Sequence, residues 1–398
     1  GDNPAISPGL FLKRGEKTVD FRLNEEQLMF RDTIRRFVQK EIAPIAADTD
    51  KYHKFPLDTL KKLGELGLMG LPLPEEWGGA GGDYLSFAMY IEELAKACAS
   101  TAVIVAVHTG LGCMSTYLFG TEEQKEKYLK PLCKGEMLGA FALTEPSAGS
   151  DAASLRTSAV RRGDRYIVNG NKIFITSGGY ADMYVTFVRT DPTTRNHQGI
   201  TCLIVDKDAP GLIIGKPEEK MGLNGSATVA LTFENMEIPV ENRMGEEGKG
   251  FNVAMALLDG GRISIGAQGL GIAQGCFDLT LPYVKSREQF GRPLTANQGV
   301  QWMLADMVTE IEAARLLIHR AAWLKDNQLP HSLEASMAKR YATDTAMRVT
   351  TDCVQLFGGY GYCREYQVER YMRDAKITQI YEGTNQIQRI VIAKRILA

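Results

Sequence analysis

Apolar positions recur at helical spacing from about residue 21 to residue 134 and again after residue 250. In 23–46 one apolar stripe predicts a long helix, and Asn24 is the predicted N-cap. Further helices are expected at 57–68, 86–99 and 121–130, and in the second half at 250–286, 297–326, 332–357 and 380–396.

The pattern changes between about residues 138 and 242. Short β-branched and aromatic runs appear there, separated by Gly, Asn, Asp and Pro at strand-and-turn intervals. We therefore predict an α+β multidomain chain: a tail (1–20), an N-terminal helical domain (21–137), a β domain (138–245) and a C-terminal helical bundle (246–398). Strands gathered in the middle argue against an alternating dinucleotide fold.

Three glycines, Gly266, Gly269 and Gly271, lie inside a helical pattern. Close packing of one helix against another is the expected reason. The stretch 97–121 contains no Lys, Arg, Asp or Glu. Because its strongly apolar part is short and is followed by His, Thr and Gly, we expect a buried core helix and no membrane span.

Charge and cysteine usage narrow the classes of function. Lys plus Arg number 46 against 48 Asp plus Glu, so a nucleic-acid partner is not expected. Seven scattered cysteines and five scattered histidines show no metal-ligand spacing, which predicts reduced thiols and no metal site. Residues 1–20 do not resemble a secretory signal. A transit peptide that was removed before Gly1 is retained as an alternative.

Two segments around the predicted β domain combine hydrogen-bonding groups with small residues. Thr144 and Ser150 lie in a Ser- and Gly-rich stretch (143–157) suited to anionic oxygens or a flat heterocycle, or simply to a surface loop. Phe174 and Thr176 are two residues apart, so both project from one face of a strand. They could contact a flat ring, or belong to an ordinary core.

Two further segments lie in the C-terminal half. Arg287 near a helix end and Gln298 in the next helix could bind phosphate, or Arg287 could be a solvated side chain. Glu382 follows the apolar Ile377 and Ile380. In one interpretation, apolar neighbours raise the pKa of the Glu382 carboxylate so that it can act as a general base. In the other, Glu382 is simply a residue at the start of a helix, where the helix dipole favours it.

Five segments, LTEPSAGSD, KIFITSGG, REQFGRPL, QLFGGYGY and IYEGTNQIQR, resemble signatures of the acyl-CoA dehydrogenase family in the family's order. The resemblance covers residues 21–398. It implies an N-terminal helical domain, a central β-barrel or sandwich domain and a C-terminal four-helix bundle. It also implies α,β-dehydrogenation of an acyl-CoA by FAD, with electrons passed to an electron-transferring flavoprotein.

The resemblance assigns roles residue by residue. Glu382 would be the catalytic base, and no metal is implied. The implied FAD contacts are Phe141, Leu143, Thr144, Ser150, Phe174, Thr176, Arg287, Phe290, Gln298, Gln355, Gly359, Thr384 and Gln386. Several of these would come from a neighbouring subunit, which implies a homotetramer. Implied substrate contacts are Ser150, Asp259, Arg262 and Gly383.

The same resemblance narrows the choice of acyl group in the expected substrate. Isovaleryl- and long-chain-type members carry their base just before the arginine of LLDGGR, where this chain has Gly261. The uncharged stretch 97–121 disfavours a dicarboxylate. A short, butyryl-like acyl group is expected, with branched short chains as the alternative. A flavin-dependent oxidase and a non-catalytic flavoprotein are the alternatives of a different class. The expected location is the cytoplasm of a bacterium, or the mitochondrial matrix of a eukaryote.

Overall fold

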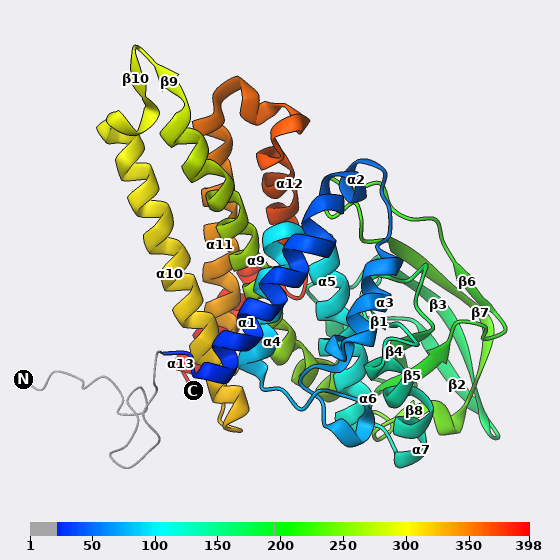
Figure 1. The fold of residues 1–398 in the computed structure, drawn as a ribbon. Helices are drawn as coiled ribbons and strands as arrows, with labels where there is room; N and C mark the ends of the chain where they lie inside the picture. The colour runs from blue at the N-terminus through cyan, green and yellow to red at the C-terminus, as the bar shows by residue number, and fades with distance from the viewer. Residues whose placement is uncertain (1–21, 195) are drawn as a thin grey trace, which may run out of the picture.

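The computed structural model describes residues 22–194 and 196–398, and the expected tail, 1–20, lies outside them. Three parts are arranged side by side (Figure 1). The sheet lies at one side, the long C-terminal helices lie at the other, and the N-terminal helices run between and across them. The predicted order of helical, β and helical parts is confirmed.

The N-terminal part is helical. Asn24 caps its first helix in a capping box with Gln27, as the sequence predicts. Three short π-helical segments, Val38–Ile42, His108–Cys113 and Lys125–Leu129, interrupt the α-helices. The α-helices are α1 (Glu25–Phe37), α2 (Ala46–Lys51), α3 (Leu57–Glu65), α4 (Tyr84–Ala97), α5 (Ala99–Val107), α6 (Met114–Phe119), α7 (Glu122–Gln124) and α8 (Lys130–Cys133).

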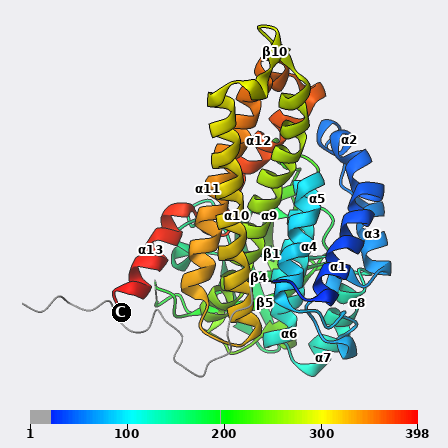
Figure 2. The same cartoon turned by 60° about the vertical axis from the view of Figure 1, so that its left-hand side comes forward.

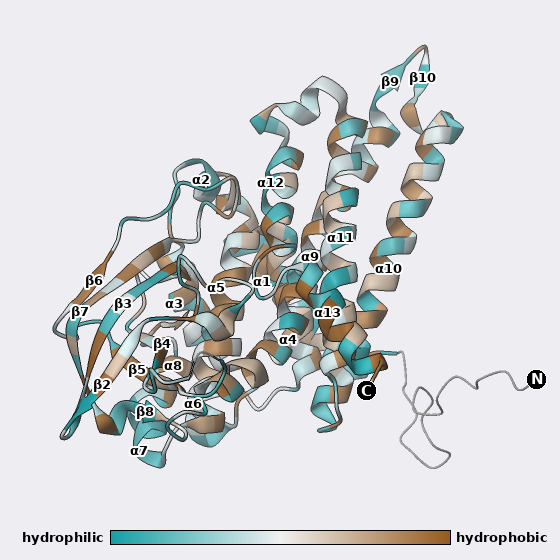
Figure 3. Cartoon of the chain, turned by 180° about the vertical axis from the view of Figure 1, so that it is seen from behind, coloured by the Kyte–Doolittle hydropathy of each residue, from teal (hydrophilic) through white to brown (hydrophobic). Residues whose placement is uncertain are grey.

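The uncharged stretch is a core helix. Within the described residues, Ala99–Phe119 is the one helical stretch long and apolar enough to span a membrane, and 78% of its most apolar window is buried inside the protein. Every residue of α5 is buried. Brown, hydrophobic stretches run along α5 and several strands in Figure 3.

The β domain is one mixed eight-stranded sheet in the order β6-β7-β3-β2-β4-β5-β8, with β1 paired in parallel to β4. Alternate residues of β4 enter two different cores: Val185 packs toward the helices, whereas Tyr184 packs within the β domain. The strands are β1 (Gly139–Ala142), β2 (Ser158–Arg162), β3 (Arg165–Thr176), β4 (Met183–Arg189), β5 (Ile200–Asp206), β6 (Leu212–Ile214), β7 (Thr228–Pro239) and β8 (Arg243–Met244).

The C-terminal part contains the longest helices, and a small hairpin joins the first two. One predicted helix, 380–396, begins later than expected, and the sequence analysis missed α12. The chain turns at 381–384 before α13 starts, and α13 projects to the side of the bundle (Figure 2). The elements are α9 (Gly250–Ser286), β9 (Glu288–Gln289), β10 (Arg292–Pro293), α10 (Gln298–Asp326), α11 (Ser332–Phe357), α12 (Val368–Thr378) and α13 (Asn385–Ile396).

The glycines of α9 allow close helix packing, as predicted. A Cβ added at Gly271 would lie 2.3 Å from the backbone oxygen of Glu92 on α4. One added at Gly269 would lie 3.1 Å from Thr343 on α11. The central helix α9 therefore contacts two neighbours at nearly backbone distance.

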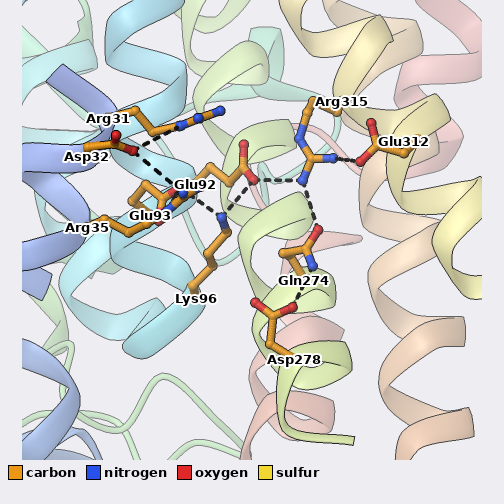
Figure 4. A network of polar contacts seen from close by, with 10 residues as sticks. All are labelled: Arg31, Asp32, Arg35, Glu92, Glu93, Lys96, Gln274, Asp278, Glu312 and Arg315. Carbon is orange, nitrogen blue, oxygen red and sulfur yellow. Dashed lines mark hydrogen bonds and ion pairs between the residues drawn. The ribbon is translucent and has the colours of Figure 1, made fainter. Parts of the chain in front are cut away.

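A polar network joins the N-terminal helices to the bundle (Figure 4). Arg35 of α1 pairs with Glu93 of α4 at 2.9 Å, and Arg315 of α10 pairs with Glu92 at 2.9 Å. Burial works to raise the pKa of Glu92, but Lys96 and Arg315 outweigh it and hold that pKa below its ordinary value. The network links α4, α9 and α10 to one another.

Candidate active site

A cavity of about 800 Å³ lies where the three parts of the molecule meet. Side chains from α5, β3, α9 and the loop before α13 form its wall, so it depends on the whole fold. Of the residues named from the sequence, the cavity is lined by Phe141, Leu143, Thr144, Ser150, Phe174, Thr176, Arg262, Glu382, Gly383 and Thr384.

A buried ion pair holds the loop that carries Thr144 and Ser150. Glu145 accepts hydrogen bonds from the backbone N–H groups of Arg156 (2.6 Å) and Thr157 (2.9 Å) and pairs with Lys172 at 2.8 Å. Lys172 also donates to the carbonyl of Leu143 at 3.1 Å. The loop is therefore held at both ends against β3.

The sequence analysis missed this pair. Burial lowers the pKa of Lys172 to about 8, although Glu145 opposes the change. Burial works to raise the pKa of Glu145, but Lys172 and the surrounding donors lower it on balance. The available signal was the period of two that places Lys172 on the same strand face as Tyr166 and Val168, where a lysine is rarely buried unless it is paired.

Phe174 and Thr176 both line the cavity, but Ile175 between them lines it too, so the alternation of strand faces does not account for their shared position. The pairing of β3 with β7 shifts register between Lys172 and Ile175. Phe174 lies at this irregularity with φ 58° and is 61% exposed. The ordinary-core interpretation is therefore wrong for Phe174, which presents its ring to open space.

Glu382 lies in a sharp turn rather than at a helix start. Its φ is 51°, that of Gly383 is 89°, and the N-cap of α13 is Thr384. Such backbone angles are uncommon for a residue with a side chain, and they occur often at functional sites. The turn directs the Glu382 side chain into the cavity wall instead of along a helix.

The Glu382 carboxylate has a buried, unpartnered oxygen. Oε2 makes no hydrogen bond, and burial raises the pKa of Glu382 to about 7 against the opposing charges of Lys339 and Arg262. A Cβ added at Gly261 would lie 2.2 Å from this oxygen. The absent side chain at Gly261 thus leaves the space that the carboxylate occupies.

Other sequence-predicted residues lie beside the cavity. Arg262 lines it and is 5% exposed. Asp259 does not line it, but accepts hydrogen bonds from Arg262 and, at 3.1 Å, from Ser332. Gln386 is exposed on α13 and is also outside the lining.

Five predicted residues form a separate surface at the far end of the bundle. Arg287 lies 5.4 Å from the ring centre of Tyr360, and Phe290 is fully exposed in the β9–β10 hairpin at the tip of the molecule (Figure 1). Within one described chain this surface does not reach the cavity lining. Its predicted members are Arg287, Phe290, Gln298, Gln355 and Gly359.

The cavity suits a flat, polar-edged group such as a flavin. Phe174 offers an exposed aromatic face beside the hydroxyl of Thr176. Across the wall, Gly149 has no atom within 4 Å of an added Cβ position, so backbone lies open to a ligand. A flavin ring can stack on an aromatic side chain and can form hydrogen bonds at its edge with hydroxyls and backbone groups, so these lining residues suit it.

Family models cover almost all of the described chain. They match the acyl-CoA dehydrogenase N-terminal domain over residues 24–136, the middle domain over 140–236 and the C-terminal domain over 248–397. The chain therefore belongs to the acyl-CoA dehydrogenase family, whose members are FAD-dependent oxidoreductases.

Individual relatives are similar over nearly their full lengths. The chain is 52% identical to a short-chain-specific acyl-CoA dehydrogenase of Clostridium acetobutylicum, covering 95% of this chain and 100% of that one. Butyryl-CoA dehydrogenase from Megasphaera elsdenii has a solved structure with TM-score 0.93 and 46% identity, over 96% and 100% of the two chains.

A second solved structure gives a similar match. It is described as the electron transferring flavoprotein of Acidaminococcus fermentans, from work towards a mechanism of flavin-based electron bifurcation. Its matching chain has TM-score 0.93 and 50% identity, over 95% of this chain and 100% of that one.

Proposed function

We propose that this chain removes two hydrogens from the α and β carbons of a short-chain acyl-CoA, giving the trans-2-enoyl-CoA. The observation that carries the proposal is the Glu382 carboxylate, which faces an 800 Å³ cavity with an unpartnered oxygen. An unpartnered carboxylate whose pKa burial raises is suited to accept a proton from carbon near neutral pH.

Glu382 is the proposed base for the α-proton. An α C–H next to a thioester is acidic enough only while its carbonyl is polarised, so hydrogen-bond donors must face the developing negative charge. FAD, when bound, supplies the acceptor for the β-hydrogen. Thr144, Ser150, Phe174 and Thr176 are the residues proposed to hold its ring.

The apolar part of the remaining lining is proposed to exclude water around Glu382 and to orient the thioester. Val107, Leu111, Leu258 and Tyr381 are apolar or aromatic members of the wall around Glu382. A dry pocket strengthens the electrostatic interactions inside it and keeps the carboxylate basic. Arg262, with Asp259 as its partner, and Gly383 are proposed to contact the CoA portion.

Two observations support a short acyl group. The Clostridium acetobutylicum relative is named as short-chain specific, and the Megasphaera elsdenii relative is named as a butyryl-CoA dehydrogenase. On this chain, α5 presents apolar side chains without charge to the cavity. Because one methylene in an apolar pocket is worth only about 1–3 kcal/mol, branched short chains are the nearest competitors.

The proposal includes two protein partners and a location. An electron-transferring flavoprotein is the proposed electron acceptor, supported by the Acidaminococcus fermentans structure. The surface around Arg287 and Phe290 is proposed to complete the FAD site of a neighbouring subunit in a homotetramer. We propose a cytoplasmic location, or the mitochondrial matrix if the source is eukaryotic.

An anaerobic titration tests the reaction. The purified flavoprotein is mixed in turn with butyryl-, isobutyryl-, 2-methylbutyryl-, octanoyl- and glutaryl-CoA while its visible spectrum is recorded. We expect butyryl-CoA to bleach the flavin most strongly. A yellow protein that none of these thioesters bleaches would contradict the proposed function, and rapid oxygen consumption in air would favour an oxidase.

A further inference from the structure

Lys339 of α11 is fully buried and donates to the loop that carries Glu382. Its Nζ lies 2.9 Å from the carbonyl oxygen of Gly383 and 3.0 Å from Oδ1 of Asn385. Both acceptors are uncharged. The equally buried Lys172, by contrast, pairs with the carboxylate of Glu145 at 2.8 Å. Burying an ammonium without a carboxylate partner is costly. If position 339 served packing only, an apolar side chain would be more stable there.

The loop held by Lys339 contains one strained residue, because a positive φ is unusual for Glu382 but ordinary for Gly383. Glu382 and Gly383 both have positive φ. The Gly383 carbonyl accepts a second hydrogen bond, at 2.9 Å, from Nε2 of the fully buried Gln388. Unusual backbone angles persist only where surrounding contacts determine them. Lys339 and Gln388 supply such contacts one residue beyond the proposed base.

Asn385 extends this anchor along α11. Its Nδ2 donates to Oγ1 of Thr343 at 2.9 Å and to Oδ1 of Asp344 at 2.7 Å, while its Oδ1 accepts from Lys339. All of these partners are on one helix. The turn before α13 is therefore attached to α11 through the Asn385 side chain as well as through the Gly383 carbonyl.

Charged and titratable groups reach Glu382 from several elements. Lys339 of α11 and Arg262 of α9 oppose the effect of burial on the Glu382 pKa. The phenols of Tyr84 on α4 and Tyr381 in the loop are affected by the Glu382 charge. Burial lowers the pKa of Lys339 to about 7, against the charge of Glu382, which works to raise it.

We infer that Lys339 is a positioning residue for the proposed base, through its two hydrogen bonds to the Gly383–Asn385 turn and through the charge that it places near the Glu382 carboxylate. The inference rests on the proposed function for the role of Glu382. It adds that the positive charge of Lys339 favours the ionised form of this carboxylate, and that its hydrogen bonds hold the turn that directs the carboxylate toward Gly261.

The experiment compares Lys339→Met, Lys339→Gln and Lys339→Arg in the FAD-loaded protein. The control is Thr350→Val, since the Thr350 hydroxyl is buried and bonds only to backbone oxygens of α11. The first readout is an infrared titration of the protonated carboxyl band that Glu382→Gln removes. The second is the pH dependence of kcat and KM with butyryl-CoA.

We expect Lys339→Met and Lys339→Gln to move the infrared midpoint to higher pH, because the ammonium charge is lost while burial remains. The kcat at pH 7 should fall about tenfold, with KM changed less, and the deficit should shrink as pH rises. Lys339→Arg should retain most of the wild-type behaviour, and Thr350→Val all of it.

An unchanged infrared midpoint in a folded Lys339→Met or Lys339→Gln protein would overturn the inference. Loss of folding in all three variants, Lys339→Arg included, would assign Lys339 a structural role and would overturn it as well. The infrared titration needs no substrate. An inactive wild type would therefore refute the proposed function while the Lys339 test still gives its own answer.

Discussion

At the residue scale, the Glu382 carboxylate occupies the space that the missing side chain of Gly261 leaves free. The turn at φ 51° directs the carboxylate to a point where any side chain at position 261 would collide with it, 2.2 Å from an added Cβ. A side chain at position 261 would therefore require the end of the flexible Glu382 side chain to move. The sequence analysis expected the base at Glu382 because position 261 is Gly, and the structure leaves space beside Gly261 for that carboxylate.

Glu382→Gln is the most direct residue-scale prediction. The amide keeps the size of the side chain but cannot accept the α-proton, so flavin reduction by butyryl-CoA should slow by about 10²–10⁴-fold. FAD content and the thermal unfolding temperature should stay near wild type. In the wild type, kcat should rise with pH through about 7, because the raised pKa leaves Glu382 protonated below that value. Reduction of Glu382→Gln at the wild-type rate would exclude Glu382 as the base.

A double variant tests whether position 261 can replace position 382. Glu382→Gly removes the carboxylate and suits the positive φ, and Gly261→Glu then places a new carboxylate beside the vacated space. We expect the double variant to reduce its flavin roughly tenfold or more faster than Glu382→Gly alone. Stopped-flow absorbance measures both rates. Equal rates in two folded, FAD-containing proteins would contradict the shared position.

At the element scale, the site depends on how closely α9 approaches its neighbours. Gly271 lets α9 pack against the backbone of α4, and the ion pairs of Glu92 with Arg315 and Lys96 lie along the same junction. The helices α4 and α9 also carry Tyr84 and Arg262, which affect or are affected by the Glu382 charge.

Gly271→Ala should destabilise the protein, because its Cβ would lie 2.3 Å from a backbone oxygen that cannot move alone. Overpacking of this kind costs about 1–3 kcal/mol, so the thermal unfolding temperature should fall by several degrees. Gly299→Ala on α10 is the matched control, since an added Cβ there meets no atom within 4 Å. It should leave the unfolding temperature unchanged or slightly raise it. Equal behaviour of the two variants would contradict the close-packing interpretation.

Elements with strong periodicity could be predicted from the sequence, and the misses have physical causes. The predicted helix 380–396 includes the turn before α13, because the apolar spacing of Ile380 and Ile387 continues across that turn, and α12 was not predicted at all. The buried Lys172 and Lys339 were missed because lysine in a pattern is assumed to be solvated. Their burial depends on acceptors distant in sequence, Glu145 and Gly383, which periodicity does not identify.

At the scale of the whole molecule, all the predicted FAD contacts except Gln386 belong to one of two surfaces. One set lines the cavity, and the other surrounds the hairpin between α9 and α10 at the far end of the bundle. A single described chain does not bring these sets together. A bound FAD that needs both must lie between two subunits, so assembly and cofactor retention should be linked.

Phe290→Ser tests this link. Phe290 is fully exposed in one chain, and burial of a Phe side chain in an interface stabilises it by about 1.5–3 kcal/mol, which predicts roughly ten- to a hundredfold weaker association per contact. We expect sedimentation velocity to show smaller species at low protein concentration, and the absorbance of those species to show less bound FAD. Val160→Ser on β2 removes another exposed apolar side chain, outside the predicted surface, and should change neither property. A wild-type monomer that retains one FAD per chain on dilution would contradict the shared site, because a cavity complete within one chain would not require the hairpin of another.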